Sequence, residues 1–216
     1  IHNETLRGYL ITSARCLPSN TSEIYHAVWN SEQFRAFGVL RVYQLITVDY
    51  ALIEQHNNTE YKLNPFIRNS LHGEELPSLY IDFFNFRGIP VPVGHEICIS
   101  GYDSHAKCGE VINSSSVVSL KSLRPGSRQD IFNNMIKAII NGQLSKRNIG
   151  GTVFGMEYDG AYVYIYVIGI VTETRYVRIH DTTTISIQPF HYIINVSPSF
   201  QKLRFLDLNI YQQLQQ

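Results

Sequence analysis

The chain of 216 residues contains three cysteines, and this odd number limits how they can form disulfides. They are Cys16, Cys98 and Cys108. In a secreted protein, an odd count leaves one pair and one further thiol, which either stays free or bonds outside the chain. The count alone leaves open which two cysteines are joined.

Histidine clusters and acidic clusters would indicate a metal centre, but no such pattern is present. The eight histidines show no paired spacing such as His-x-x-x-His. We therefore predict neither a metal site nor a cofactor.

Five Asn-x-Ser/Thr sequences are acceptors for N-linked sugars along a secretory route. A chain this rich in Asn, Ser and Thr would contain roughly two of them by chance. The excess favours secretion, and chance occurrence stays open as the alternative. Glycosylation is expected at Asn3, Asn20, Asn57, Asn113 and Asn195.

The charge balance argues against whole classes of partner. Lys+Arg and Asp+Glu number 18 each, so no electrostatic argument favours nucleic acid or an anionic membrane surface.

No apolar run approaches the roughly 20 residues needed to span a bilayer. The most apolar stretch, Ala161–Val171, is shorter and contains Gly169. The first residues lack the basic start and apolar core of a signal peptide, so we expect a mature or trimmed chain.

The sequence pattern predicts mainly β-strands as the elements that position the cysteines and the other candidate residues. Tyr, Ile, Val and Phe are abundant, and turn residues interrupt their short apolar runs, which favours an all-β sandwich or barrel. Glu157–Gly160 ends in Asp-Gly and is expected to form a hairpin turn between Met156 and Ala161. The predicted strands are Gly8–Ser13, Phe37–Gln44, Tyr50–Glu54, Leu79–Phe84, Glu96–Ser100, Gly109–Ile112, Thr152–Met156, Ala161–Val171, Tyr176–Ile179 and Thr184–Ile187.

One segment departs from the strand pattern. Around 127–143 the apolar residues repeat at the spacing of one helical face, which predicts an amphipathic helix. Ser127 fits its start and Gly142 its end. We expect this helix to pack on the barrel rather than to bind a partner. A short C-terminal helix is expected over Phe190–Ile194 or from Phe200.

Four segments, in this order, resemble the chymotrypsin-like serine proteases, especially their bacterial α-lytic and streptogrisin-type branch. Gly8–Cys16 resembles the strand that ends in Thr-Ala-x-His-Cys. Val48–Glu54 is similar to the Asn-Asp-x-Ala-Leu-Ile segment that holds the catalytic aspartate. Pro92–Gly109 matches the Val-Gly turn, the Cys-x-Ser-Gly strand and the Cys-Gly ending of the bacterial branch. Asn148–Phe154 resembles the nucleophile loop Asp-Ser-Gly-Gly-Pro-Val-Phe.

The resemblance implies two antiparallel β-barrels of the six-stranded type, with a cleft between them, in one trypsin-like domain. Residues 1–85 would form the N-terminal barrel, with its first strand truncated or missing, and residues 86–216 the C-terminal barrel and tail. The resemblance also implies a disulfide between Cys98 and Cys108. Cys16 matches a cysteine whose partner lies upstream, so it is either a free thiol or bonded to an upstream fragment or a second chain.

The residues that perform catalysis in this family are largely replaced. In the family a histidine removes the serine proton and an aspartate orients the histidine. The matching positions hold Arg15, Ile149 and, unchanged, Asp49. A guanidinium stays protonated at any relevant pH and cannot act as a general base, and an isoleucine has no nucleophilic atom.

The loop that stabilises the oxyanion in this family is also altered. Its positions are Arg147, where the family has glycine, Asn148, where the family has aspartate, and Gly150. Arg15 and Asp49 would face each other across the cleft, either as an ion pair or as two separately solvated groups.

We therefore interpret the chain as a catalytically dead pseudoprotease, a secreted binding protein whose ligand is an unknown protein or glycan. Two other classes stay open. One is an enzyme that reuses the cleft, for which Ser145, His26 and His56 are the unassigned candidates. The other is a structural or assembly subunit, whose exposed aromatic residues would form one contiguous apolar patch.

Overall fold

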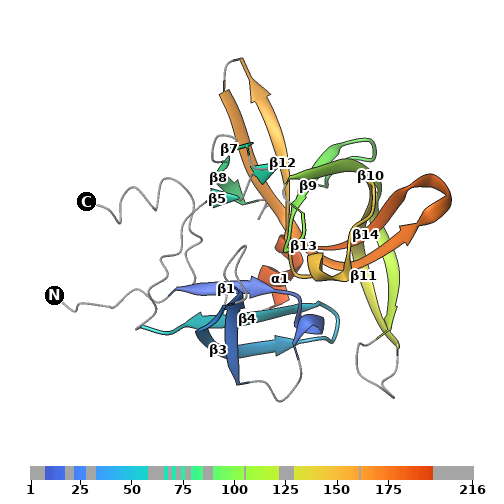
Figure 1. Cartoon of the computed structure of the whole chain (residues 1–216). Coiled ribbons are helices and arrows are strands. Elements are labelled where there is room, and N and C mark those ends of the chain that lie inside the picture. Colours follow the sequence, from blue (N-terminus) through green and yellow to red (C-terminus); the bar gives the residue numbers. More distant parts are fainter. Residues whose placement is uncertain are drawn as a thin grey trace.

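In the computed structural model, most of the described residues lie in strands (Figure 1). The structure describes residues 8–17, 22–27, 33–57, 66–67, 70–71, 74–75, 79–84, 90–104, 106–121, 129–160 and 162–196. The strands are β1 (Tyr9–Thr12), β2 (Glu23–Ala27), β3 (Phe34–Gln44), β4 (Tyr50–Gln55), β5 (Phe66–Ile67), β6 (Ser70–Leu71), β7 (Glu74–Glu75), β8 (Leu79–Phe84), β9 (Glu96–Ser100), β10 (Lys107–Lys121), β11 (Gln129–Asn141), β12 (Thr152–Asp159), β13 (Tyr162–Val177) and β14 (Thr182–Pro189). The described helices are the short 3-10 turns η1 (Ala14–Cys16), η2 (Lys146–Asn148) and η3 (Arg178–His180), and α1 (Phe190–Val196).

The second half of the chain closes into a six-stranded barrel. Its strands follow the order β12-β9-β10-β11-β14-β13, and β12 also pairs with β13, which completes the ring. Closure removes the open edges that a flat sheet would leave. The interior is filled by apolar side chains that include Ile97, Ile99, Val111, Ile140 and Ile185.

The first half forms an antiparallel sheet with the strand order β1-β4-β3-β2. Figure 1 shows this sheet below the closed barrel, with α1 between the two. A shared apolar cluster joins them, because residues from β4, β13 and α1 are buried against one another. The cluster consists of Val48, Tyr50, Leu52, Val167, Ile170, Phe190 and Ile193. The predicted all-β fold, with its short C-terminal helix at the first of the two expected positions, is confirmed.

Strand β8 links the two halves through main-chain hydrogen bonds. It runs parallel to β13, where Ile81 pairs with Ile165, and β5 pairs with β8 in turn. Because β8 lies within residues 1–85, a strand from the first half extends the sheet of the second. The division of the chain near residue 85 stays a prediction.

The predicted amphipathic helix around 127–143 is wrong, because this segment is the strand β11. It pairs with β10 on one side and β14 on the other. Asn134 has a φ of 57°, a left-handed conformation that interrupts the alternation of the strand. Phe132 is buried before this interruption and Met135 and Ile136 after it. Two alternating runs joined in this way imitate the spacing of a helical face.

The remaining predicted elements differ from the structure at their ends. The hairpin between β12 and β13 extends further than expected, since Met156 pairs with Ile165 and Asp159 with Tyr162. Gly160 has the positive φ, 61°, that the Asp-Gly turn requires. The predicted strand Tyr176–Ile179 stops at Val177, where η3 begins. No helix among the described residues is long and apolar enough to cross a membrane.

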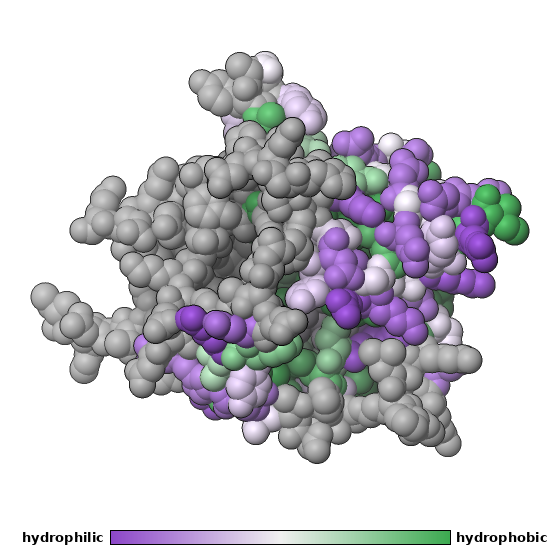
Figure 2. Space-filling view, viewed as in Figure 1, coloured by the Kyte–Doolittle hydropathy of each residue, from purple (hydrophilic) through white to green (hydrophobic). Residues whose placement is uncertain are grey.

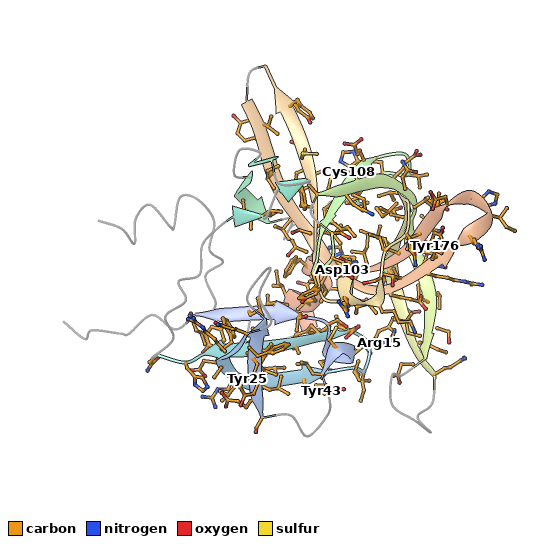
Figure 3. The ribbon with its side chains drawn as sticks, in the orientation of Figure 1. Arg15, Tyr25, Tyr43, Asp103, Cys108 and Tyr176 are labelled. Carbon is orange, nitrogen blue, oxygen red and sulfur yellow. A yellow bond between two sulfur atoms is a disulfide. The ribbon has the colours of Figure 1, made fainter. Side chains whose placement is uncertain are left out.

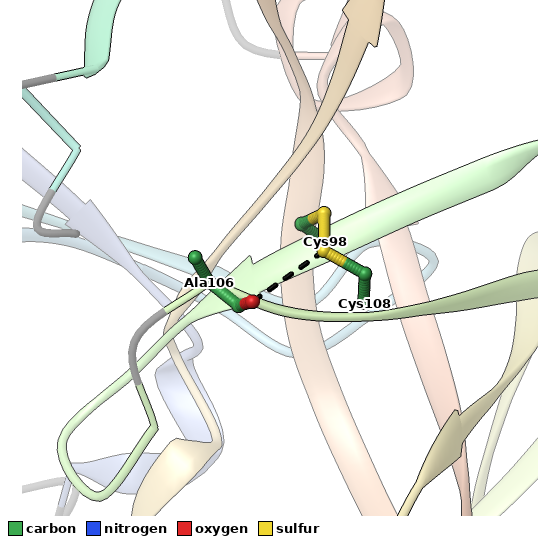
Figure 4. Close-up of a disulfide and its surroundings, with 3 residues drawn as sticks. All are labelled: Cys98, Ala106 and Cys108. Carbon is green, nitrogen blue, oxygen red and sulfur yellow. Dashed lines mark hydrogen bonds between the residues drawn. A yellow bond between two sulfur atoms is a disulfide. The ribbon is translucent and has the colours of Figure 1, made fainter. Parts of the chain in front are cut away.

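The disulfide between Cys98 and Cys108 is present, as the resemblance implied. The two residues face each other across β9 and β10. Cys98 is fully buried beside Ile67 and Phe154, and the Cys108 Sγ lies 3.4 Å from the main-chain oxygen of Ala106 (Figure 4). The bond therefore ties the tip of the β9–β10 hairpin to a buried cluster.

We expect the loss of this disulfide to lower the free energy of unfolding by about 2–3 kcal/mol, because the short loop it closes restricts the unfolded chain. The double substitution Cys98→Ser and Cys108→Ser, followed by urea unfolding, measures the effect. Cys16→Ser is the matched control and should change stability by less than about 1 kcal/mol, because a hydroxyl can replace the thiol as donor. Equal stability of the double variant and the parent would contradict the expectation.

Candidate functional site

The three positions that the resemblance assigns to the catalytic triad lie together where the two sheets meet. Arg15 belongs to η1 after β1, Asp49 precedes β4, and Ile149 follows η2. Cys16 donates from its thiol to the main-chain oxygen of Ile149 at 3.3 Å. A Cβ atom added to Gly150 would overlap the Thr12 hydroxyl. The turn η1 and the loop after η2 are thus in direct contact.

Asp49 is the organising residue of this contact. It is fully buried, and its carboxylate accepts a hydrogen bond from the Ser13 hydroxyl at 2.7 Å. The second carboxylate oxygen accepts from the main-chain N–H of Arg15 at 3.3 Å. The Asp49 main-chain N–H donates to the side-chain oxygen of Gln188 at 3.2 Å. The carboxylate therefore holds η1 in place, and β14 holds the main chain of Asp49.

Burial raises the pKa of Asp49 to about 6, and the Ser13 hydrogen bond and the Arg15 charge only partly offset this. Arg15 contacts this carboxylate through its main-chain N–H. Because Asp49 is fully buried, its carboxylate is not a separately solvated group, and an ion pair with the Arg15 guanidinium stays a prediction. Figure 3 shows Arg15 beside the first sheet and Asp103 beside the closed barrel.

The main-chain N–H groups of residues 147–151, in the loop around η2, all have acceptors within the protein. A loop that stabilises an oxyanion needs such groups free and aimed at the reacting oxygen. Here each donor already has an acceptor within the chain. The bonds are Arg147 N to the Ser145 hydroxyl at 3.1 Å, Asn148 N to Ser145 O at 3.2 Å, Ile149 N to Lys146 O at 3.1 Å, Gly150 N to Val171 O at 2.7 Å and Gly151 N to Asn148 O at 3.0 Å.

Side chains of the same loop lock this conformation. Asn148 is buried, and its amide donates to the main-chain oxygen of Ser145 at 3.2 Å. Arg147 extends outward, with its guanidinium 5.6 Å from the centre of the Tyr102 ring and 3.9 Å from an Asp103 oxygen. The Ser145 hydroxyl donates to the other Asp103 oxygen. The described partner of the Ser145 hydroxyl is therefore a carboxylate and not a histidine.

Of the other unassigned candidates, His56 is the one whose side chain the structure describes, and it is not brought to Ser145. His56 lies 2.6 Å from a carboxylate oxygen of Glu23 on the first sheet, whereas Ser145 lies on the second. The side chain of His26 lies outside the described residues. Among the described residues, Glu96 with Cys98 and Cys108 is the group that could hold a metal, but both sulfur atoms are in the disulfide.

Cys16 is the free thiol of the chain, because the other two cysteines are bonded to each other. Part of this residue reaches solvent, but its sulfur is turned toward Ile149. Burial of the thiol, and secondly the charge of Asp49, raise its pKa to about 11. A thiol that stays protonated at neutral pH is a weak nucleophile. Bonding of Cys16 to an upstream fragment or a second chain stays a prediction.

Sequence reasoning missed two residues that build the site. Ser13 caps η1, since its hydroxyl also accepts from the main-chain N–H of Arg15 at 3.3 Å. Gln188 is buried within β14 and supports Asp49. The only signal for either was a polar residue in an apolar run, which does not identify its partner.

Comparison with known proteins places this geometry in a known fold. No family model and no curated protein matches the chain. Solved structures do match: Cellulomonas bogoriensis chymotrypsin, at 17% identity over 86% of this chain and 80% of that chain, has a TM-score of 0.55. Thermobifida fusca protease A, at 12% identity over 88% and 81%, has a TM-score of 0.59. A homologue of α-lytic protease, N4, at 17% identity over 89% and 85%, has a TM-score of 0.60.

The chain therefore has the fold of the chymotrypsin-like serine proteases, with neighbours of the bacterial α-lytic type. This agrees with the resemblance carried by the four sequence segments. At 12% to 17% identity, the likeness to these solved structures shows the fold alone.

Proposed function

We propose that this chain is a secreted pseudoprotease, which has the serine protease fold but binds a ligand instead of cleaving it. The observation that carries the proposal is the contact between η1 and the loop after η2. In this contact a guanidinium and a hydrocarbon side chain, those of Arg15 and Ile149, stand where the family resemblance expects base and nucleophile.

Loss of catalysis follows from the chemistry of these two residues. Acyl transfer needs an attacking oxygen and a group that takes up its proton. Ile149 supplies no such atom, and Arg15 stays protonated. Removal of one triad member already reduces the rate by several orders of magnitude, and here two are replaced.

The conformation of the η2 loop supports the same proposal independently of the triad. Stabilisation of the oxyanion is usually the largest single contribution to catalysis of this kind. The N–H groups of Arg147 and Ile149 are both engaged within the loop. A substrate carbonyl would have to displace these bonds before it could be polarised.

Secretion is supported by the disulfide and by the exposed sequons. Disulfides persist in oxidising compartments and are rare in the cytosol. Of the five sequons, the asparagines that the structure describes are all exposed at the surface, and they are Asn57, Asn113 and Asn195. Asn3 and Asn20 lie outside the described residues.

A binding role fits a rigid barrel that presents exposed loops beside the altered triad positions. The ligand would be a protein or a glycan that contacts Lys146, Arg147 and Tyr102, three exposed residues that we call the rim. An assembly subunit would be expected to expose one contiguous apolar patch. On the face drawn in Figure 2, apolar side chains of the described residues lie over the first sheet and, apart from these, at a tip on the right.

The proposal is tested by capture of a ligand from the medium of cells that secrete the protein. We expect the immobilised protein to retain a partner uncleaved, and Arg147→Ala to weaken that retention at least about tenfold because its exposed guanidinium lies on the rim. Arg178→Ala, an exposed arginine on η3, is the matched control. Equal retention by Arg147→Ala and Arg178→Ala would show that the ligand binds away from Arg147. A captured protein that is cut at one defined bond would indicate an enzyme.

A further inference from the structure

Asn113 is the sequon that the structure describes completely. Its three residues, Asn113, Ser114 and Ser115, all belong to β10. For the other four sequons, either the asparagine or the hydroxyl residue two positions later lies outside the described residues. The geometry of an acceptor can therefore be examined at this one position.

The side chain of Asn113 uses its oxygen, and not its amide nitrogen, in the hydrogen bond that the structure shows. Asn113 is exposed, and its side-chain oxygen accepts the main-chain N–H of Ser115 at 2.9 Å. This bond engages the oxygen and leaves the amide nitrogen without an acceptor among the described residues. The Ser115 hydroxyl donates to the side-chain oxygen of Asn134 on β11 at 3.3 Å. A substituent on the amide nitrogen would break neither bond.

An irregularity in the ladder creates this orientation. The pairing of β10 with β11 shifts between Val111 and Asn113 and again between Asn113 and Ser116. The second shift places three steps of β10 opposite two steps of β11, from Lys137 to Met135. A bulge of this kind turns a side chain out of the regular alternation.

The same stretch of β10 extends beyond the closed part of the barrel and, among the described residues, is paired on one edge. Strand β9 pairs with β10 up to Glu110. From Asn113 to Lys121, the described partner of β10 is β11 alone. Within this stretch Val117 is 67% exposed. An exposed strand edge with apolar side chains can pair with another copy, and proteins generally cover or charge such edges.

We propose that Asn113 carries an N-linked oligosaccharide, and that this sugar covers the open edge of β10. The donor is a polyprenyl-pyrophosphate-linked oligosaccharide of the secretory pathway. The Asn113 amide nitrogen forms the bond to the anomeric carbon and loses one proton. The bond from that carbon to the pyrophosphate oxygen breaks, and polyprenyl pyrophosphate leaves with the electron pair. The inference rests on the proposed secretion.

Peptide mapping of the protein secreted by eukaryotic cells tests the modification. Release of N-glycans in heavy-oxygen water should convert Asn113 to a labelled aspartate. Asn113→Gln should remove the mass of one glycan, whereas Ser115→Thr, which preserves the sequon, should retain it. An unmodified Asn113 beside an occupied Asn57 or Asn195 would overturn the inference and leave secretion standing. A chain without any glycan and with Cys98 and Cys108 reduced would instead overturn the proposed secretion.

The covering role is tested by light scattering on the wild-type protein before and after enzymatic removal of its glycans, which needs no substitution. We expect the deglycosylated protein and Asn113→Gln to self-associate at concentrations at which the glycosylated protein is monomeric. Asn195→Gln is the control and should stay monomeric. If the deglycosylated protein and Asn113→Gln both stay monomeric, the covering role is refuted. If Asn195→Gln alone associates, the glycan at Asn195 has the covering role instead.

Discussion

Hydrolysis of peptide and ester substrates by the purified protein is expected to be at least about 10⁴-fold slower than by an active serine protease. That factor is the typical effect of losing one triad function, and here two positions are changed. Ile149 offers no attacking oxygen, and the N–H groups of η2 are engaged within the loop. A fluorophosphonate that labels reactive serines should leave no adduct detectable by mass spectrometry, with trypsin as the positive control.

Restoring the two side chains gives a sharper version of this experiment. The double variant Arg15→His and Ile149→Ser would supply a base and a nucleophile beside Asp49. We expect at most a trace of ester hydrolysis, because the closed η2 loop still lacks a free donor for the oxyanion. Robust activity of the unmodified protein, abolished by Ser145→Ala, would overturn the proposed function.

The parts of the fold that could be predicted from sequence are those carried by local patterns in a shared order. The segments around Cys98, Cys108 and Asp49 could be matched because strand, turn and cysteine spacing are properties of neighbouring residues. The helix predicted around 127–143 failed for a related reason. A single left-handed residue, Asn134, changes the phase of an alternating strand, and a short window cannot distinguish this from a helical repeat.

The hydrogen bonds of the site could not be predicted in this way. Ser13 and Asp49 are 36 residues apart, and Asp49 and Gln188 are 139 apart. Contacts at such separations depend on how the two sheets dock. The conformation of η2 depends likewise on Asp103, which engages Ser145 from another loop. The sequence could therefore indicate which side chains stand at the triad positions, but not that the N–H groups of the η2 loop have acceptors within the chain.

Burial raises the pKa of Asp49 to about 6. The contribution of this residue to the free energy of unfolding is therefore expected to fall as the pH rises from about 4 to about 6. Below the ordinary aspartate pKa, both folded and unfolded chains are protonated at this position. As the pH rises, the unfolded chain ionises first, which favours unfolding. Above pH 6 Asp49 is ionised in both the folded and the unfolded chain, and the loss of stability no longer grows with pH. A shift of this size corresponds to about 3 kcal/mol.

Asp49→Asn isolates this contribution from other titrating groups, such as His191, whose pKa burial lowers and whose effect on stability has the opposite sign. Asparagine keeps an oxygen for the Arg15 N–H, and its amide can donate to the Ser13 hydroxyl after that hydroxyl rotates. We expect Asp49→Asn to match the parent near pH 4 and to exceed it by about 1–3 kcal/mol at pH 7.5 in urea unfolding, because no buried charge forms. Asp49→Ala, which leaves the Ser13 and Arg15 donors without an acceptor, should instead lose stability at every pH. If Asp49→Asn is less stable than the parent at pH 7.5 and this deficit shrinks toward pH 4, the carboxylate is stabilising in its charged form and the assignment of the raised pKa is wrong.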